Sequence, residues 1–215
     1  VLEDTYTNIS TLNKAKKNIT ILVEKKINRL VPVCVLDDYS NDNTEEWLLK
    51  NNIHYIKNKK NLGYEKNLIN GIKKFRKKYD YLITFDGDGQ HKISDLKKII
   101  NTKINYDIII CNRKNKNRFL EVIISIISYF FFGLRDPLSG FKVYKTKILK
   151  QKKFKEIENY FLVDFLLTFV KRDLKIINIE ISTKKRIGSS RVGNSISLTL
   201  KELKILFKLI SKKFA

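Results

Sequence analysis

The chain of 215 residues contains few of the residues that interrupt or cross-link a fold: two prolines, eight glycines and two cysteines. So little proline and glycine excludes a collagen-like or low-complexity chain, because such chains need these residues in abundance. With 43% hydrophobic and 31% charged residues, the composition is that of a globular protein. The length fits one domain of ordinary size and is too short for two full domains with a linker.

The two cysteines, Cys34 and Cys111, each lie inside a short apolar stretch. This placement predicts small buried side chains in a reducing compartment rather than a disulfide or metal ligands. The longest nearly uncharged apolar stretch, residues 122–134, is well short of the roughly 20 residues that a membrane-spanning helix needs. The opening residues, VLEDTYTN, show no secretory signal. We therefore expect no segment of this chain to span a membrane.

Acidic residues are half as numerous as basic ones, 22 against 44, which gives a formal net charge of +22. A charge of this size suits binding to nucleic acid or to an anionic membrane. However, only eight of the 44 basic residues are arginine, and asparagine and isoleucine are abundant, as in chains encoded by AT-rich DNA. Much of the lysine is therefore expected on a solvated face. Because no aromatic stacking platform lies among the basic residues, we expect no nucleic-acid partner.

Helix-like and strand-like segments alternate along the chain. Residues 19–27 (ITILVEKKI) have apolar positions at helical spacing and predict a helix, whereas the apolar residues 31–38 and 107–111 predict buried strands. This alternation predicts an α/β fold with a mainly parallel sheet between helices, which binds ligands at the carboxyl ends of its strands. Helices are also predicted at residues 44–50, 63–78 and 94–102, the last with Ser94 as N-cap, and strands at residues 54–58 and 81–85.

Paired acids follow two of the predicted strands: Asp37 with Asp38, and Asp86 with Asp88. Carboxylates gathered at one edge of a sheet repel one another, so a cation or the donors of a ligand usually accompany them. In Asp86-Gly87-Asp88 the alternation of side chains points both carboxylates to one side, and the glycine lets a ligand approach the backbone. The pattern suits Mg²⁺ or Mn²⁺ held together with substrate phosphates. A plain surface turn is the alternative.

Five segments occur in order along most of the chain: VCVLDDYSNDNT (33–44), NLGYEKNLINGI (61–72), ITFDGDGQH (83–91), DPLSGFKVYKTKIL (136–149) and RIGSSRVG (186–193). Together they resemble family 2 glycosyltransferases of the GT-A fold, and among these the dolichol- and polyprenyl-phosphate sugar transferases such as dolichol-phosphate mannosyltransferase. The resemblance implies a GT-A domain, a Rossmann-like nucleotide-diphospho-sugar transferase fold, over residues 1–195. A C-terminal basic amphipathic helix would follow over residues 196–215.

The resemblance implies how a nucleotide sugar would be bound. Asp38 would hold the nucleobase or the ribose, and Gln90 would lie beside the sugar. Asp86 and Asp88 would hold Mg²⁺ or Mn²⁺ on the diphosphate. Arg186 belongs to a basic loop that would close on the diphosphate, although a plain surface charge is the alternative.

The resemblance also implies the acceptor side and the chemistry. Arg113 would face the phosphates or the acceptor, and Asp136 and Ser139 would lie near the acceptor, although Asp136 before Pro137 also fits a simple turn. The reaction would be an inverting substitution at the anomeric carbon, in which arginine and metal charge stabilise the departing diphosphate. The residues assigned to catalysis are Asp164, Asp136, Arg186 and Arg191, with Ser190 in the same loop as the two arginines.

Asp164 is singled out because one acid in an aromatic, aliphatic helix is costly unless it is paired or lines a site. As a base it would serve a sugar-hydroxyl acceptor, whereas a phosphate acceptor is already ionised and needs little base help. Pairing with a nearby lysine or arginine is the alternative.

Three features depart from the family pattern. The family opens with a strand that carries Pro-x-Tyr-Asn-Glu, whereas here only Thr5-Tyr6 remains and Asn8 stands in place of the glutamate. Tyr39 replaces a glycine after the paired acids, and Arg191 replaces a lysine. These departures leave alternatives open: an active enzyme, or a truncated or decayed, inactive copy whose sheet lacks its first strand.

Two segments suggest a membrane partner. Residues 119–134 are apolar on nearly all faces, and residues 198–214 place leucine, phenylalanine and isoleucine on one side and lysines on the other. Basic amphipathic helices of this kind bind anionic membrane surfaces, although a surface helix packed on the domain is the alternative. The leading prediction is a peripheral enzyme at the cytoplasmic face that uses a polyprenyl-phosphate acceptor. A sugar-hydroxyl acceptor in polysaccharide or glycan synthesis and a non-catalytic basic module are the competing predictions.

Overall fold

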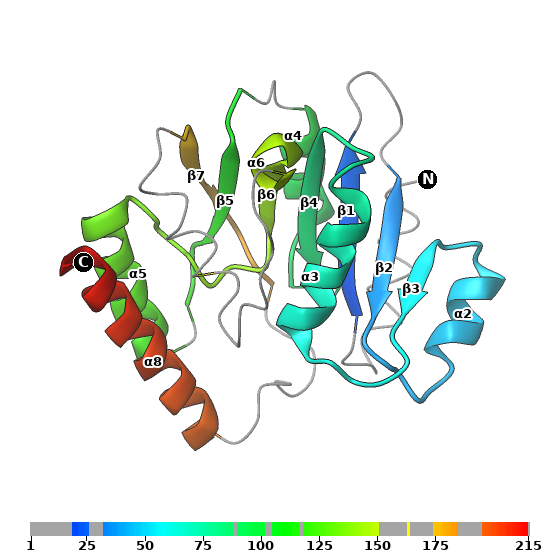
Figure 1. The fold of residues 1–215 in the computed structure, drawn as a ribbon, viewed down its shortest axis with the longest axis horizontal. Helices are drawn as coiled ribbons and strands as arrows, with labels where there is room; N and C mark the ends of the chain where they lie inside the picture. Colours follow the sequence, from blue (N-terminus) through cyan, green and yellow to red (C-terminus); the bar gives the residue numbers. More distant parts are fainter. Residues whose placement is uncertain are drawn as a thin grey trace.

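A computed structural model describes residues 19–25, 32–87, 90–101, 105–116, 118–150, 163, 174–184 and 195–214. Its centre is a seven-stranded sheet in the order β3-β2-β1-β4-β6-β5-β7 (Figure 1). The strands are β1 (Ile19–Lys25), β2 (Val33–Asp37), β3 (Tyr55–Lys57), β4 (Tyr81–Asp86), β5 (Ile108–Arg113), β6 (Lys142–Lys145) and β7 (Ile176–Ile181). The helices are α2 (Thr44–Lys50), α3 (Tyr64–Phe75), α4 (Ile93–Asn101), α5 (Phe119–Phe132), α6 (Thr146–Lys150) and α8 (Ser195–Phe214).

The predicted α/β fold is confirmed, and the sheet is mixed. The pairs β2–β3 and β5–β7 are parallel, whereas β1 pairs antiparallel with β2 and β4, and β6 pairs antiparallel with β4 and β5. Five strands therefore run in one direction, with β1 and β6 inserted the opposite way. The prediction of a mainly parallel sheet is correct in that most strands run in one direction. It does not hold for neighbouring strands, because most adjacent pairs are antiparallel.

The predicted helix at residues 19–27 is wrong for its described part, because residues 19–25 form the strand β1 in the interior of the sheet. Ile21 pairs with Val35 of β2 on one side and with Phe85 of β4 on the other. A short apolar stretch fits both helical and strand spacing, and its β-branched residues favour a strand. The strands β2 and β4 decide the outcome. Their backbone N–H and C=O groups need partners, and a strand placed between them forms hydrogen bonds with both. The opening motif at residues 5–8 lies outside the described residues.

Both faces of the sheet are buried, as the continuous apolar strands predicted. Side chains alternate along each strand, so that Leu36 and Leu82 pack on the α3 side, whereas Val35 and Ile83 pack on the α4 side. Figure 1 shows α3 in front of the sheet and α4 behind it. The same alternation buries Cys34 and Cys111 as free thiols on opposite faces, as predicted.

The helices α5 and α8 pack against one another beside the β5–β7 end of the sheet (Figure 1). Their contact is built from Ile124 of α5 with Ile205 and Leu209 of α8, all buried. No helix among the described residues is long and apolar enough to cross a membrane. The predicted N-cap Ser94 lies inside α4, which begins one residue earlier because the Lys92 carbonyl accepts the first N–H groups.

Candidate functional site

The carboxyl ends of β2, β4 and β5 lie at one edge of the sheet, because these strands run in the same direction. Asp37 ends β2, Asp86 ends β4 and Arg113 ends β5. Because β6 runs the opposite way, the preceding segment, residues 136–141, arrives at the same edge. The fold thus brings together residues that the sequence analysis placed after separate strands.

Asp86 has a different side chain next to each carboxylate oxygen. The hydroxyl of Tyr64, in the first turn of α3, donates to Oδ1 at 3.1 Å, and Nε2 of His91 lies 3.5 Å from Oδ2. Burial alone would raise the pKa of Asp86, but the imidazole, the hydroxyl and the more distant guanidinium of Arg113 outweigh it and lower this pKa below its usual value. Asp86 is therefore ionised at neutral pH, and its side chain remains 30% exposed. An ionised, accessible carboxylate is what Mg²⁺ or Mn²⁺ binds.

Gly140 lies directly against the Asp86 carboxylate. A Cβ at this position would lie 2.0 Å from Oδ2 and 2.3 Å from Oδ1 of Asp86, closer than any real contact. Glycine is needed here for the close approach, because a larger residue would displace the carboxylate. The glycine of the Asp136–Phe141 segment thus has a place in the site that the sequence analysis did not assign.

Asp38, the predicted nucleotide ligand, is buried and occupied by groups of the chain itself. Oδ1 accepts from the side-chain amide of Asn58 at 2.9 Å and from the backbone N–H of Leu62 at 2.8 Å, and Oδ2 accepts from the backbone N–H of Gly63 at 2.8 Å. Its side chain is only 5% exposed. The carboxylate therefore organises the loop between β3 and α3. A nucleotide contact by Asp38 stays a prediction.

Arg113 and Asp136, both predicted on the acceptor side, form one buried ion pair. The guanidinium donates twice, from Nε to Oδ2 at 2.8 Å and from Nη2 to Oδ1 at 3.1 Å, and the Arg113 backbone N–H adds a third hydrogen bond. Burial would raise the pKa of Asp136, but this pairing lowers it below its usual value. Asp136 is fully buried and bound to Arg113, and a contact of Asp136 with the acceptor stays a prediction.

Ser139 and Lys142 are buried beside this pair. The Ser139 hydroxyl accepts from the backbone N–H of Phe141 at 3.2 Å, and its carbonyl accepts from the Lys142 ammonium. Burial lowers the pKa of Lys142 to about 8, partly offset by the charges of Asp136 and Asp86. Lys142 thus places a positive charge close to Asp86 and Asp136 at the edge of the sheet. The hydroxyl of Ser139, which was predicted to contact the acceptor, forms its hydrogen bond with Phe141 of the same segment.

A second set of charges links the site to α5 and α8. Arg118 contacts Glu121 of α5 and lies 3.0 Å from Glu202 of α8, and both glutamate side chains are nearly buried. Nη2 of Arg113 lies 3.8 Å from Glu121, so the buried pair at the sheet edge is continuous with this cluster. Burial raises the pKa of Glu202, although the charge of Arg118 opposes the rise.

Of the remaining predicted site residues, the structure describes Gln90 but not the others. Gln90 is half-buried next to His91, and its carbonyl accepts from the backbone N–H of Lys184 at 2.8 Å. No group of three or more acidic, histidine or cysteine side chains that would hold a metal was found among the described residues, which include only one acid of the predicted metal pair. The residues that lie outside the described ranges are Asp88, Asp164, Arg186, Ser190 and Arg191.

Tyr64, Gly140 and Lys142 belong to the site, although none was singled out from the sequence. All three lie in segments that carry the family resemblance, in NLGYEKNLINGI and DPLSGFKVYKTKIL. Gly140, two residues before the strand β6, gave the one local signal, because a glycine at a strand often marks a close approach of other groups. The tyrosine and the lysine gave no such signal, since their contacts join segments far apart in the sequence.

Solved structures with this fold define the class. Glucosyl-3-phosphoglycerate synthase of Mycobacterium tuberculosis, in complex with Mn²⁺, UDP-glucose and phosphoglyceric acid, superposes with a TM-score of 0.61 at 14% identity, over 84% of this chain and 68% of that one. A mycobacterial protein superposes with a TM-score of 0.63 at 12% identity, over 96% and 70%. The fold is that of GT-A glycosyltransferases.

The sequence then places the chain within that class. The model for glycosyl transferase family 2 matches residues 8–163, and the chain belongs to this family. The predicted enzyme class, a glycosyltransferase, is thereby confirmed. The chain is also 32% identical to the uncharacterized protein MJ0544 of Methanocaldococcus jannaschii, over 82% of this chain and 86% of the relative. The uncharacterized protein MJ1222 of the same organism is 28% identical, over 84% and 80%.

Proposed function

We propose that this glycosyltransferase moves a sugar from a nucleotide sugar, with the help of Mg²⁺ or Mn²⁺, to a polyprenyl phosphate at the cytoplasmic face of a membrane. The observation that carries the choice of acceptor is the apolar surface of α5 and α8, whose side chains are exposed among the residues that the structure describes. The donor and the acceptor halves of this proposal rest on different residues.

The donor half rests on Asp86. It is ionised, partly exposed and held at the carboxyl end of a central strand, where α/β folds bind their ligands. Its oxygens fit a hard divalent cation, and Asp88 is the second predicted ligand. The synthase of similar fold was solved with Mn²⁺ and UDP-glucose. A bound cation would supply positive charge to the departing diphosphate. The predicted task of Arg186 and Arg191 is the same: to stabilise that charge.

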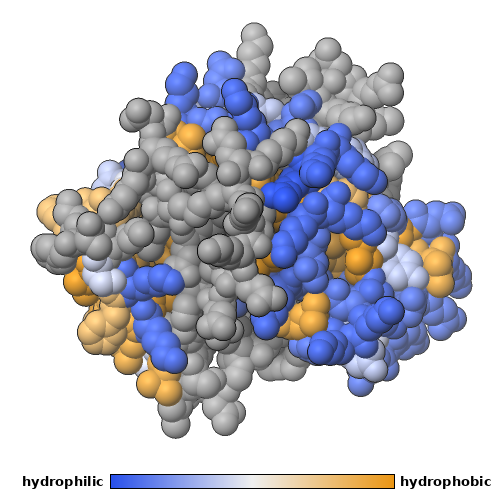
Figure 2. Space-filling view, in the orientation of Figure 1, coloured by the Kyte–Doolittle hydropathy of each residue, from blue (hydrophilic) through white to orange (hydrophobic). Residues whose placement is uncertain are grey.

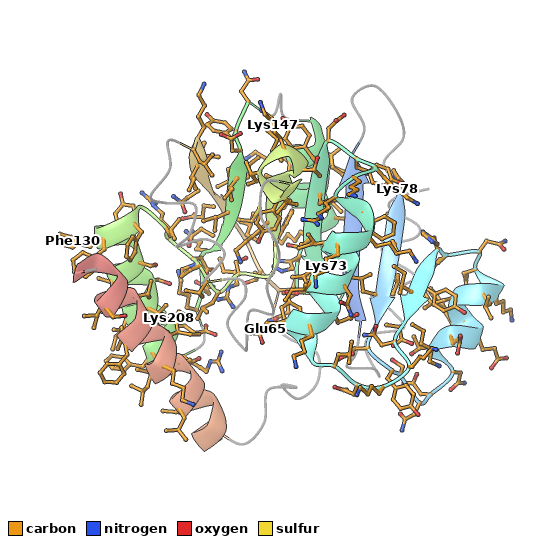
Figure 3. All side chains as sticks on the ribbon, in the orientation of Figure 1. Glu65, Lys73, Lys78, Phe130, Lys147 and Lys208 are labelled. Atoms are coloured by element: carbon orange, nitrogen blue, oxygen red, sulfur yellow. The ribbon has the colours of Figure 1, made fainter. Side chains whose placement is uncertain are left out.

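The acceptor half rests on a stripe along α5. Apolar side chains recur every three or four residues on its outer face, which makes one continuous strip. Phe130 is 82% exposed and points away from the body of the molecule (Figure 3). Figure 2 shows apolar residues gathered at this end, whereas the α2 end is mostly hydrophilic. The apolar surface of α5 and α8 consists of Phe119, Val122, Ile126, Tyr129, Phe130, Leu200, Phe207 and Ile210.

Lysines lie beside this surface on α8. Leu200, Phe207 and Ile210 fall within about 80° of one another on the helix, and the exposed Lys204 and Lys208 lie on the adjoining side. The opposite side of α8 packs on α5. Each lysine near an anionic membrane contributes about 1 kcal/mol of binding, and the apolar strip adds burial in the interface. The two roles predicted for this helix, packing on the domain and binding an anionic membrane, are therefore compatible. One side of α8 packs on α5, and the other side presents apolar residues and lysines.

A small phosphorylated acceptor is the second candidate. The similar synthase was solved with phosphoglyceric acid, which offers a phosphate but no lipid tail. An enzyme for such an acceptor has no use for the apolar surface of α5 and α8. That surface is the reason to prefer the lipid.

Transfer assays test the proposal. Labelled UDP-, GDP- and dTDP-sugars are offered with polyprenyl phosphate in anionic vesicles, with phosphoglyceric acid in solution, or with neither, each with and without Mn²⁺ or Mg²⁺. We expect cation-dependent transfer to the lipid. Transfer to phosphoglyceric acid alone would refute the lipid acceptor, and equal rates without a cation would refute the metal.

A pair of variants tests the surface itself. Phe130→Glu combined with Phe207→Glu is expected to abolish co-sedimentation with anionic vesicles. The control is Leu49→Glu on α2, a residue that is 61% exposed at the other end of the molecule. Vesicle binding that survives the double change, or that falls equally in the control, would contradict the assignment of this surface.

A further inference from the structure

The loop between β3 and α3 is tied to the strand β2 by a continuous set of hydrogen bonds. The Asn58 amide donates both to Asp38 and, at 2.9 Å, to the side-chain oxygen of Asn67. The Asn67 amide in turn donates to the Leu36 carbonyl of β2 at 3.1 Å. The side chains of Asp38 and Asn67 are both buried. Because a buried carboxylate that loses its donors is costly, this arrangement holds the start of α3 against the sheet.

The first residue of α3 is Tyr64, and the residue before it determines where its side chain goes. Gly63 has a φ of +84°, a conformation that glycine adopts without strain, and its N–H donates to Asp38. The Tyr64 ring packs against the core cluster of the sheet on this face. Its hydroxyl reaches across to β4 and meets Oδ1 of Asp86 at 3.1 Å.

We propose that Asp38 and Tyr64 are positioning residues for the donor site: Asp38 holds the loop that places the Tyr64 hydroxyl on Asp86, and this hydroxyl sets the orientation of the cation-binding carboxylate. The inference rests on the donor half of the proposed function. It differs from the sequence prediction for Asp38, because it has that residue act through Tyr64 rather than on the nucleotide.

The geometry around Asp86 explains why one more hydrogen bond matters. Gly140 closes one side of the carboxylate and His91 lies beside Oδ2, so the hydroxyl of Tyr64 fixes the rotation that these two contacts leave open. Cation ligands tolerate displacements of only about 0.2 Å.

Tyr64→Phe tests the second step of this arrangement. Mn²⁺ binding is measured by calorimetry in the presence of UDP and, separately, of GDP, and melting temperatures are measured on the same preparations. We expect about tenfold weaker Mn²⁺ binding. The matched control is Tyr55→Phe, because the Tyr55 hydroxyl donates to the Glu45 carboxylate at 2.9 Å, away from the site. The control should lose a similar amount of melting temperature and keep its Mn²⁺ affinity.

Asp38→Asn tests the first step. We expect weaker Mn²⁺ binding with an unchanged preference between UDP and GDP, and no further loss when Asp38→Asn is combined with Tyr64→Phe, because both act through one contact. Asp42→Asn is the control, since Asp42 accepts from the start of α2 instead. Additive losses in the double variant, or a changed nucleotide preference in Asp38→Asn, would overturn the relay through Tyr64.

The wild type separates this inference from the proposed function. A wild type that binds Mn²⁺ with the nucleotide while Tyr64→Phe binds equally well overturns the positioning role alone. A wild type without nucleotide-dependent Mn²⁺ binding overturns the donor half of the proposed function and this inference with it. A failure of lipid transfer leaves both steps standing, because neither involves the acceptor.

Discussion

Replacing Gly140 by alanine is the most direct test of the site at Asp86. The added Cβ would lie 2.0 Å from Oδ2 and 2.4 Å from Cγ of Asp86, so the whole carboxyl group must move by about 1 Å or more to reach an ordinary contact. A cation ligand displaced that far is lost, because coordination distances vary by only about 0.2 Å. Among the described glycines only Gly63 and Gly133 have a positive φ, so the backbone at position 140 accepts alanine without strain.

The effects of Gly140→Ala on Mn²⁺ binding and on the free energy of unfolding can be measured separately. Overpacking of this kind costs about 1–3 kcal/mol of unfolding free energy. We expect Mn²⁺ affinity in the presence of UDP to fall at least tenfold, which is a loss of about 1.4 kcal/mol or more. Urea unfolding and calorimetry on the same preparations measure the two effects.

Gly71→Ala is the matched control. A Cβ there would lie 2.4 Å from Cδ1 of Leu36, so it also overpacks the protein, but in the core contact between α3 and β2. Alanine returns about 0.5–1 kcal/mol of helix stability at this position. We expect Mn²⁺ affinity to stay within about twofold of the wild type. If Gly140→Ala binds Mn²⁺ as the control does, Asp86 is not the ligand whose position matters, and the reasoning fails.

Three further predictions follow from the buried charges. Asp136→Asn should cost about 3–5 kcal/mol in urea unfolding, because it removes the carboxylate that binds the Arg113 guanidinium twice and leaves only Glu121, 3.8 Å away, as a charged partner. Unchanged stability with a lower transfer rate would instead support the catalytic role predicted from the sequence. Arg118→Ala should cost about 1–3 kcal/mol, at the lower end because Arg118 is 38% exposed. Part of this loss should be recovered as the pH falls through the pKa of Glu202, which burial raises above its usual value, because a protonated Glu202 no longer needs a cationic partner; a loss that is constant with pH would contradict this. Between pH 8 and 10 Lys142 is protonated in the unfolded chain but has lost its proton in the folded chain, because burial lowers its pKa to about 8. The free energy of unfolding of the wild type should therefore rise by about 1 kcal/mol per pH unit relative to that of Lys142→Met. Parallel pH profiles of unfolding free energy for the two proteins would exclude this titration.

Much of the fold was predictable from local pattern. The apolar strands at residues 31–38, 81–85 and 107–111 and the helices at 44–50 and 63–78 were placed within a few residues, because a strand buried on both faces and an amphipathic helix each leave a distinct spacing. The first strand was not predictable in this way. The sequence ITILVEKKI fits either spacing, and only the place between β2 and β4 makes it a strand.

The sequence by itself determined the chemistry at the sheet edge: Asp86 directly after a buried strand, Arg113 after the next, and Asp136 in the segment Asp136-Pro137-Leu138-Ser139-Gly140-Phe141. These follow from residue order, since parallel strands bring their carboxyl ends together. What each side chain contacts was decided only by the tertiary structure. Arg113 binds Asp136, Asp38 binds the loop before α3, and Tyr64 reaches Asp86 across 22 residues. Such contacts depend on the relative placement of distant segments by core packing, and no local spacing in the sequence records that placement.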